Sequence, residues 1–245
     1  NMHREKNHLA LLTLITVVSV IFFHSRFLIN WDAGQFALGT IHYSLSDHTP
    51  HPPGYYLFVQ SGKILALLTH DINIAFIILA CLAGTAALLF FYRTILLLTG
   101  NAFSALLVSL FLFANPVFWY ARSVALTYSF EALASTLSLW ATTEVLLRRT
   151  ARAFVFNCAA LAILSGFRPS IILTSIPLLA IQMVSLRMEW KTLVLGILSG
   201  TICGLLWFVP FIITAGGLQS ALSAITLQAS TIHSERLFDV TSQSL

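Results

Sequence analysis

The sequence predicts an all-α membrane protein, a polytopic bundle of about seven transmembrane helices. Hydrophobic residues make up 58% of the 245 residues and charged residues only 9%, whereas a soluble domain carries about 25% charged residues. The apolar residues also recur in runs long enough to cross about 30 Å of hydrocarbon. The net charge of +4 is not gathered into a basic stripe, so the lipid bilayer, and not nucleic acid, is the expected partner.

The first span is expected over residues 9–29. Arg4 and Lys6 precede the apolar run from Leu9 to Phe23, which is the arrangement of a signal peptide. No small-residue cleavage site follows the run, so we interpret it as an uncleaved signal anchor that leaves the N-terminus in the cytoplasm.

Residues 30–73 are expected outside the cytoplasm, as a loop that carries juxtamembrane helices. Residues 32–41 predict a short surface helix. Residues 54–68 are apolar but short, and they contain several polar side chains, so we expect a helix at the interface instead of a span. In the alternative, this segment spans the membrane and inverts the topology of everything that follows.

Six further spans are expected, over residues 72–98, 101–119, 124–147, 153–167, 170–187 and 191–214. Lys and Arg residues favour cytoplasmic loops, so their distribution tests this arrangement. The predicted cytoplasmic side holds eight of them: Arg4, Lys6, Arg93, Arg148, Arg149, Arg152, Arg187 and Lys191. The predicted outer side holds five: Arg26, Lys63, Arg122, Arg168 and Arg236. The cluster at 148–152 argues most strongly against the inverted topology.

Gly216 and Gly217 break the last span, and residues 218–232 predict an amphipathic surface helix. Because the sequence stops soon afterwards, we expect residues 1–245 to be a single transmembrane domain from the N-terminal part of a longer protein. The cysteines lie inside apolar runs, and we interpret them as core residues and not as a disulfide or metal site. They are Cys81, Cys158 and Cys203.

The polar stretch 30–56 interrupts this hydrophobic chain. It carries two carboxylates, three histidines and three prolines: Asp32, Asp47, His42, His48, His51, Pro50, Pro52 and Pro53. Proline fixes φ and removes a hydrogen-bond donor, so the backbone around His51 is expected to be rigid and non-helical. Such a segment between apolar helices lies at the membrane surface or lines a cavity. An ordinary polar loop is the alternative.

Two ionisable residues stand out, since charges beside membrane spans are costly and mark functional sites. Asp32 follows Trp31, an expected interfacial anchor, and partial desolvation there suits a general base. The alternative is an N-cap for a helix that begins at Ala33.

Arg168 precedes Pro169, which suits the first turn of the next helix, so a guanidinium and a helix N-terminus would together hold a phosphate. The alternative is an arginine that reaches lipid headgroups.

Other polar groups on the predicted outer face have weaker indications. Glu131 follows Tyr128 by one helical turn and is expected to form a structural ion pair with a cation, Arg122 being the candidate. The spacing of His42, His48 and His51 with nearby carboxylates allows an argument for zinc. No complete ligand motif is present, so neither a divalent metal nor another cofactor is assigned.

Three stretches carry a family resemblance. They are Trp31-Asp32-Ala33-Gly34-Gln35-Phe36, then His51-Pro52-Pro53-Gly54-Tyr55, then Phe118-Trp119 leading to Tyr128. Together they resemble the C-type membrane glycosyltransferases, the GT-C superfamily, in the branch related to the protein O-mannosyltransferases. The resemblance covers nearly all of residues 9–190.

That resemblance implies transfer of a mannose-like sugar from a polyprenyl-phosphate donor to a protein, lipid or glycan acceptor. The reaction would occur on the extracytoplasmic side of a multi-pass protein, in the plasma membrane of a bacterium or archaeon or in the endoplasmic reticulum of a eukaryote. Sugar phosphodiesters leave as a stable phosphate, so the two carboxylates of a glycosidase are not required. Asp32 is the expected base, with inversion. The expected phosphate ligands are Arg168, Arg122 and Lys63, and the expected pocket residues are Gln35, His51, Tyr55, Tyr128 and Glu131.

The chain departs from the family pattern at two positions. Gln35 stands where a second acid typically follows Asp32 by three residues, and Leu126 stands where an acid often precedes Tyr128. An inactive relative that serves as a partner subunit is therefore one alternative. A transporter or flippase for a lipid-linked or anionic solute is another, although it predicts polar residues at the membrane midplane and internal repeats, whereas the ionisable groups here gather at one face.

Overall fold

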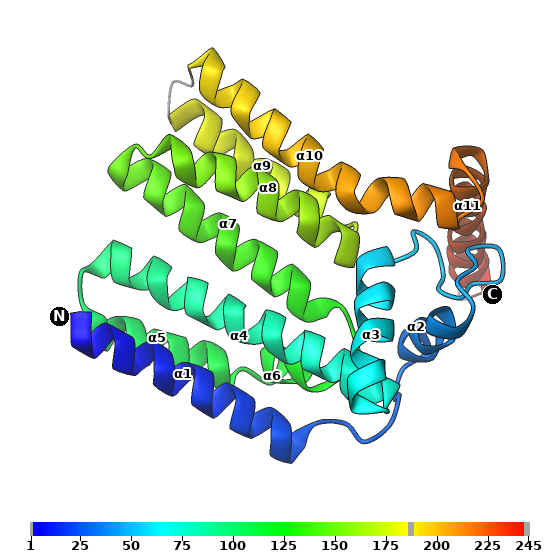
Figure 1. Ribbon diagram of the computed structural model, residues 1–245, viewed down its shortest axis with the longest axis horizontal. Coiled ribbons are helices and arrows are strands. Elements are labelled where there is room, and N and C mark those ends of the chain that lie inside the picture. The colour runs from blue at the N-terminus through cyan, green and yellow to red at the C-terminus, as the bar shows by residue number, and fades with distance from the viewer. Residues whose placement is uncertain (1, 186–188, 243–245) are drawn as a thin grey trace.

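The computed structural model describes residues 2–185 and 189–242, and this part of the chain confirms the all-α prediction (Figure 1). It forms a bundle of helices joined by short turns, with a longer polar connection between the second and third. The helices described are α1 (Met2–Phe23), α2 (Trp31–Ile41), α3 (Tyr56–Thr69), α4 (Ile72–Thr99), α5 (Ala102–Ala114), α6 (Pro116–Ser123), α7 (Tyr128–Arg148), α8 (Ala151–Phe167), α9 (Ile171–Ser185), α10 (Trp190–Thr214) and α11 (Leu218–Ser242).

Helix α4 is the centre of the bundle. It packs against α7 most extensively and also against α1, α3, α5 and α6. Half of its most apolar window, 50%, is buried, compared with 17% for α1 and 6% for α10. Helices α1 and α10 therefore form the rim, and their apolar side chains are left for the surrounding lipid.

Three described helices, α1, α4 and α10, are long and apolar enough to cross a membrane, and α5 with α6 makes a fourth if the bent pair is one span. The chain is therefore a membrane protein by the composition of its helices. Helices α8 and α9 are apolar but have only 17 and 15 residues. That these two and α7 also cross the bilayer, as the count of seven requires, stays a prediction.

The segment predicted as a span over 101–119 is not one straight helix, because the chain bends by 68° between α5 and α6. The side chain of Asn115 accepts hydrogen bonds from the N–H groups of Val117 and Phe118, at 3.0 and 3.1 Å. Pro116 takes the first position of the new helix, where its missing N–H costs nothing, and it keeps the preceding residue out of helical geometry. The Asn-Pro pair thus ends one helix and starts another.

The first helix also ends earlier than predicted, at Phe23 instead of residue 29. The segment that follows is held against the bundle by two hydrogen bonds. The N–H of Ser25 donates to the carbonyl of Ser123 at 2.9 Å, and Asn73 Nδ2 donates to the carbonyl of Ser25 at 2.9 Å. At the other end of the chain, α11 extends the helix predicted for 218–232 as far as Ser242.

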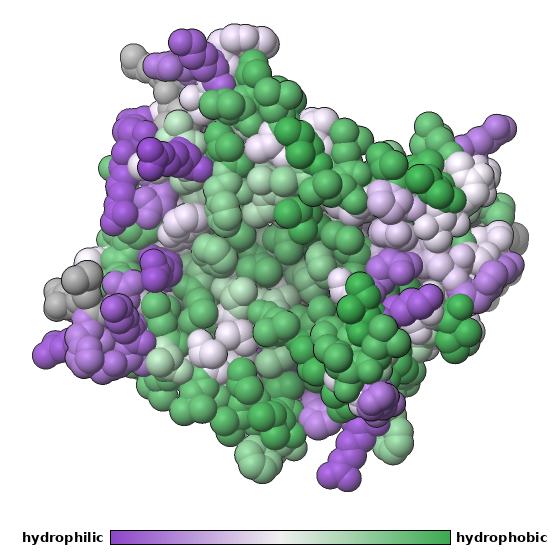
Figure 2. Space-filling view, viewed as in Figure 1, coloured by the Kyte–Doolittle hydropathy of each residue, from purple (hydrophilic) through white to green (hydrophobic). Residues whose placement is uncertain are grey.

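The start of α1, the α4–α5 and α7–α8 turns, the end of α9 and the start of α10 lie at one end of the bundle (Figure 1). The same edge is hydrophilic in Figure 2, and a broad hydrophobic band separates it from the polar groups at the opposite end. Arg149 Nη1 donates to the carbonyl of Ser185, so the α7–α8 turn is tied to the end of α9. The predicted cytoplasmic basic residues gather at this end, except Arg187, which lies outside the described residues.

Cysteine labelling tests the orientation of the bundle. In a variant with alanine in place of the native cysteines, Thr150→Cys is expected to resist a membrane-impermeant maleimide in intact cells and to react after permeabilisation. Ser46→Cys, on an exposed loop at the opposite end, is expected to react in intact cells. Labelling of position 150 from outside would contradict the topology and move every proposed site to the cytoplasmic side.

Candidate functional site

Arg168 links the end of α8 to the start of α7, at the end of the bundle opposite the basic turns. Its Nε lies 2.8 Å from Glu131 Oε2, and its Nη1 donates to Thr127 Oγ1 at 2.9 Å. The guanidinium also stacks over the ring of Tyr128, 4.6 Å from the centroid. These contacts hold the guanidinium against the start of α7 while 19% of the side chain stays exposed. Nη2 has no hydrogen bond or ion pair within the described chain.

The backbone of Arg168 differs from the prediction. Its N–H donates to the carbonyl of Leu164 and caps the C-terminus of α8. Helix α9 begins at Ile171, so Pro169 lies ahead of the first helical turn instead of inside it. The phosphate-binding capacity of Arg168 therefore rests on its guanidinium at the start of α7, and not on the N-terminus of its own helix.

Arg122 does not pair with Glu131, and that prediction is wrong. The arginine is fully buried, with 0% of its surface exposed. Its guanidinium lies over Phe113 at 4.2 Å and Phe118 at 5.2 Å, and Nη1 donates to the carbonyl of Phe113 at 3.2 Å. A phosphate from outside cannot reach it there, so the structure argues against Arg122 as a phosphate ligand.

The burial of Arg122 depends on Gly84 of α4. A Cβ atom on Gly84 would lie 2.8 Å from the Cβ of Arg122, so a larger residue would exclude the arginine. Its Nε and Nη2 have no hydrogen-bond partner among the described residues. A buried donor without a partner is costly. The Arg122 side chain nevertheless ties the bend between α5 and α6 to the central helix α4, because it packs against Gly84.

Asp32 lies in the first turn of α2, and it does not cap that helix. The cap is Asn30, whose Oδ1 accepts a hydrogen bond from the N–H of Asp32 at 2.9 Å. The alternative interpretation of Asp32 as an N-cap is therefore wrong. The carboxylate is half-buried and makes no hydrogen bond or ion pair in the described part of the chain, so it is available to a ligand.

His51 and Gln35 hold the polar loop against α2. His51 Nδ1 donates to Gln35 Oε1 at 2.5 Å, which places the proton of the neutral ring on Nδ1 and leaves Nε2 as an acceptor. The His51 ring lies between Phe36 and Tyr55, with centroids 5.9 and 5.0 Å away. Gln35, in the place of a family acid, is only 8% exposed and uses its carbonyl oxygen for this contact.

The turn that brings His51 and Tyr55 to the site requires Gly54. Its φ of +106° suits glycine alone, and a Cβ there would lie 2.6 Å from the hydroxyl of Tyr43. That hydroxyl donates to the carbonyl of Gly54 at 2.8 Å. The glycine turn and this hydrogen bond fix the end of the proline-rich loop, where α3 begins.

The pKa values of His51 and Tyr55 respond to the same two neighbouring charges, Asp32 and Arg168, and we call these four residues the cluster. Burial lowers the pKa of His51, and the charge of Asp32 opposes this while those of His48 and Arg168 add to it. Burial raises the pKa of Tyr55; Arg168 opposes the shift, and Asp32, Tyr128 and Glu131 strengthen it. The hydroxyl of Tyr55 therefore stays a hydrogen-bond donor.

Lys63 stands apart from this cluster. It lies on the exposed face of α3 and forms no hydrogen bond or ion pair with a described residue. The histidines and carboxylates of the loop do not converge either. Across the described residues, no three His, Cys, Asp or Glu side chains lie close enough together to hold a metal ion.

Two cavities border the cluster. The first, of about 630 Å³, is an apolar groove between α8, α9 and α10 that reaches Pro53 and Pro169, next to Arg168. The second, of about 570 Å³, lies between the start of α2 and the loop around residues 47–49 and includes Gln35. Sequence reasoning missed both, because each is formed by helices distant in sequence or by the path of an irregular loop.

No protein-family model, no curated protein and no solved structure significantly matches this chain. The function must therefore be argued from the cluster and its cavities.

The half-buried His51 makes stability depend on pH. Its folded pKa lies below the ordinary value of 6.5, so below pH 6.5 the unfolded chain takes up a proton that the folded chain does not. The free energy of unfolding is therefore expected to fall as the pH drops from about 6.5 toward the lowered pKa. Melting curves from pH 7.5 to 5.5 should show a smaller loss in His51→Gln than in wild type. His42→Gln is the control, because that side chain is 75% exposed, and an equal change in both variants would contradict the prediction.

Proposed function

We propose that this protein is a membrane glycosyltransferase that moves a sugar from a polyprenyl-phosphate donor to an acceptor hydroxyl on the extracytoplasmic face. The observation that carries the proposal is a carboxylate without a partner, Asp32, near a guanidinium whose Nη2 is unused, Arg168. Both charges influence the pKa of His51 and of Tyr55, which supports a single site for the base and the phosphate ligand. The resemblance of the three motifs to the GT-C superfamily supports the same chemistry.

In this proposal Asp32 takes the proton of the acceptor hydroxyl as its oxygen attacks the anomeric carbon. The bond between that carbon and the phosphate oxygen breaks, and polyprenyl phosphate leaves with the electron pair. Arg168 stabilises the phosphate charge through the N–H donors not used by Glu131 and Thr127. Attack from the side opposite the leaving group inverts the anomeric centre.

The apolar groove supplies what a polyprenyl chain needs. Its lining is almost entirely hydrocarbon and aromatic, and it runs between α8, α9 and α10, the last of which faces lipid. One end reaches Pro53 and Pro169, and Pro169 follows Arg168 in the chain. A chain lying in the groove would therefore place its phosphate near the guanidinium, where burial strengthens the electrostatic attraction.

The neutral polar residues between α7, α8 and α9 give less support to a transporter. Ser138 Oγ donates to Asn157 Oδ1 at 3.0 Å, and Gln182 Nε2 donates to Thr142 Oγ1 at 2.8 Å. These neutral groups link α7 with α8 and α9, which is how polar side chains hold membrane helices together. They supply no charge for an anionic solute.

A transfer assay tests the proposal. The purified protein in liposomes is given polyprenyl phosphates that carry labelled mannose, glucose or galactose, together with peptide, lipid and glycan acceptors. We expect a labelled product with the opposite anomeric configuration to the donor. No transfer from any donor, in protein that binds polyprenyl phosphate, would favour the inactive partner subunit.

A further inference from the structure

The second cavity has the composition of a sugar-binding site and not of a lipid site. Its lining combines an aromatic ring, two amides, a carboxylate and an imidazole with aliphatic groups. The polar and aromatic residues of the lining are Asn30, Trp31, Gln35, Asp47, His48 and Thr49. Asn30, Trp31, Gly34 and Gln35 flank Asp32 in the chain, so the cavity lies against the same first turn of α2 as the proposed base.

The aromatic ring of the cavity lining is exposed and can contact a ligand. Trp31 is 80% exposed at the first position of α2, so its ring is not used to pack the protein core. Large aromatic rings offer an apolar face with a polar edge, and the C–H face of a pyranose ring fits such a surface. Trp31 can therefore serve as a stacking platform at the mouth of the cavity.

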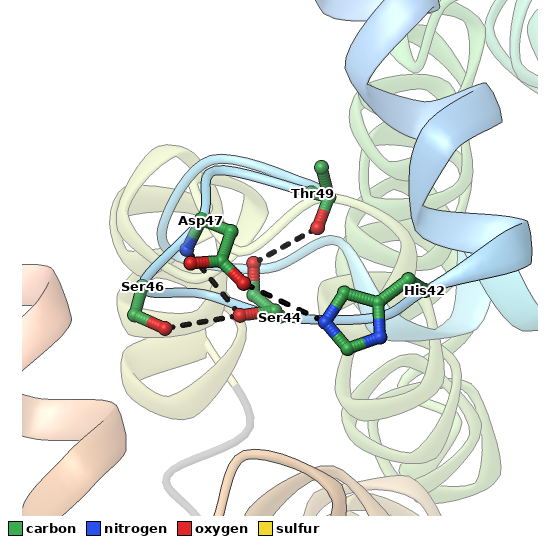
Figure 3. Close-up of polar contacts among 5 residues, drawn as sticks. All are labelled: His42, Ser44, Ser46, Asp47 and Thr49. Atoms are coloured by element: carbon green, nitrogen blue, oxygen red, sulfur yellow. Dashed lines mark hydrogen bonds and ion pairs between the residues drawn. The ribbon is translucent and has the colours of Figure 1, made fainter.

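The opposite wall is a small loop closed by its own hydrogen bonds (Figure 3). Ser44 and Thr49 exchange two backbone hydrogen bonds of 2.9 and 2.8 Å. The hydroxyl of Ser44 accepts from the N–H of Asp47 at 3.3 Å, and Asp47 Oδ2 lies 3.5 Å from His42 Nε2. Asp47 Oδ1 has no partner in the described part of the chain, so a fixed carboxylate oxygen remains for a ligand.

The charge of the lining restricts the ligand. The cavity contains one carboxylate, Asp47, and no Lys or Arg. An anionic ligand would be repelled by Asp47 and would find no permanent cation, whereas vicinal hydroxyl groups suit carboxylate, amide and imidazole partners. The donor phosphate therefore belongs with Arg168, and a neutral hydroxyl-rich ligand fits this cavity.

We propose that the cavity binds a neutral saccharide, which is the acceptor of the transfer. The role of the saccharide as acceptor rests on the proposed function, whereas the binding of a saccharide is inferred from the cavity alone. Trp31 stacks on the sugar ring, Asp47 accepts hydrogen bonds from its hydroxyl groups, and one further hydroxyl reaches Asp32.

Saccharide binding to the purified protein tests the inference. The protein is placed in phospholipid nanodiscs, because glycosidic detergents would compete, and saturation-transfer NMR is recorded with neutral di- and trisaccharides of mannose, glucose and galactose. We expect binding of at least one of them. Asp47→Ala is expected to lose about tenfold or more in affinity, the scale of a lost charge-assisted hydrogen bond, and Trp31→Ala about tenfold, the scale of a lost aromatic contact. Trp190→Ala is the control, since that ring is similarly exposed, at 73%, on the first turn of α10.

The outcomes separate this inference from the proposed function. Absence of saccharide binding, or binding unchanged in both cavity variants, overturns the inference. Transfer to a peptide or lipid acceptor without saccharide binding overturns it too, while the glycosyltransferase proposal stands. Saccharide binding that needs Trp31 and Asp47, with no transfer from any donor, supports the cavity and overturns the glycosyltransferase proposal.

Discussion

Asp32→Asn is expected to lower the turnover of sugar transfer by about 10²–10⁴-fold, the usual contribution of a general base. Asparagine keeps the shape of the side chain but cannot accept the proton of the acceptor hydroxyl. Donor binding and folding are expected to persist, because the carboxylate makes no hydrogen bond or ion pair within the described residues. The measurement is single-turnover transfer of labelled sugar from a polyprenyl-phosphate donor.

The position of the helix cap separates the loss of the carboxylate from any loss of helix stability. Asn30, and not Asp32, caps α2, so Asp32→Asn leaves the cap intact. Asp71→Asn is the matched control, because it makes the same substitution at an exposed residue outside both cavities that caps α4, and Asn caps a helix about as well as Asp. Asp32→Glu keeps the charge but moves it by one methylene. Full turnover in Asp32→Asn would falsify the assignment of the base.

The sequence predicts the helices well because their signal is local. Long apolar runs require helices in a membrane, where every backbone group must be satisfied within its own segment, and a helix lies within or across each predicted span. The bend between α5 and α6 also has a local signal in the sequence. Asn115-Pro116 is a helix stop followed by a helix start, but the continuous hydrophobicity around it obscured that signal.

The composition of the site is less accessible from sequence because it depends on how helices are rotated against one another. The polar stretch 30–56 indicates that Asp32 and His51 belong to one region. Nothing in the sequence shows which arginine pairs with Glu131, because Arg122 and Arg168 are both predicted on the outer face, beside polar segments. Gly84, where a side chain would exclude Arg122, decides the choice through packing.

Arg168→Ala is expected to weaken the binding of polyprenyl phosphate by about 1.5–3 kcal/mol, the scale of a hydrogen bond to a charged group. In affinity this is roughly ten- to a hundredfold or slightly more. Arg168→Lys is expected to recover only part of the loss, because lysine keeps the charge but lacks the planar fork. Binding of a labelled polyprenyl phosphate in nanodiscs measures the effect. Arg148→Ala is the control, since it removes a positive charge from the opposite end of the bundle.

Glu131 complicates the interpretation of Arg168→Ala, and a second variant resolves it. Without the guanidinium, the Glu131 carboxylate loses its ion-pair partner and would repel the phosphate by itself. The double variant Arg168→Ala, Glu131→Gln removes both charges, so any loss that persists in it belongs to the missing phosphate contact. We expect most of the loss to persist. Full recovery of affinity in the double variant would assign the effect to Glu131 alone. Wild-type affinity in Arg168→Ala itself would assign Arg168 to the lipid headgroups instead.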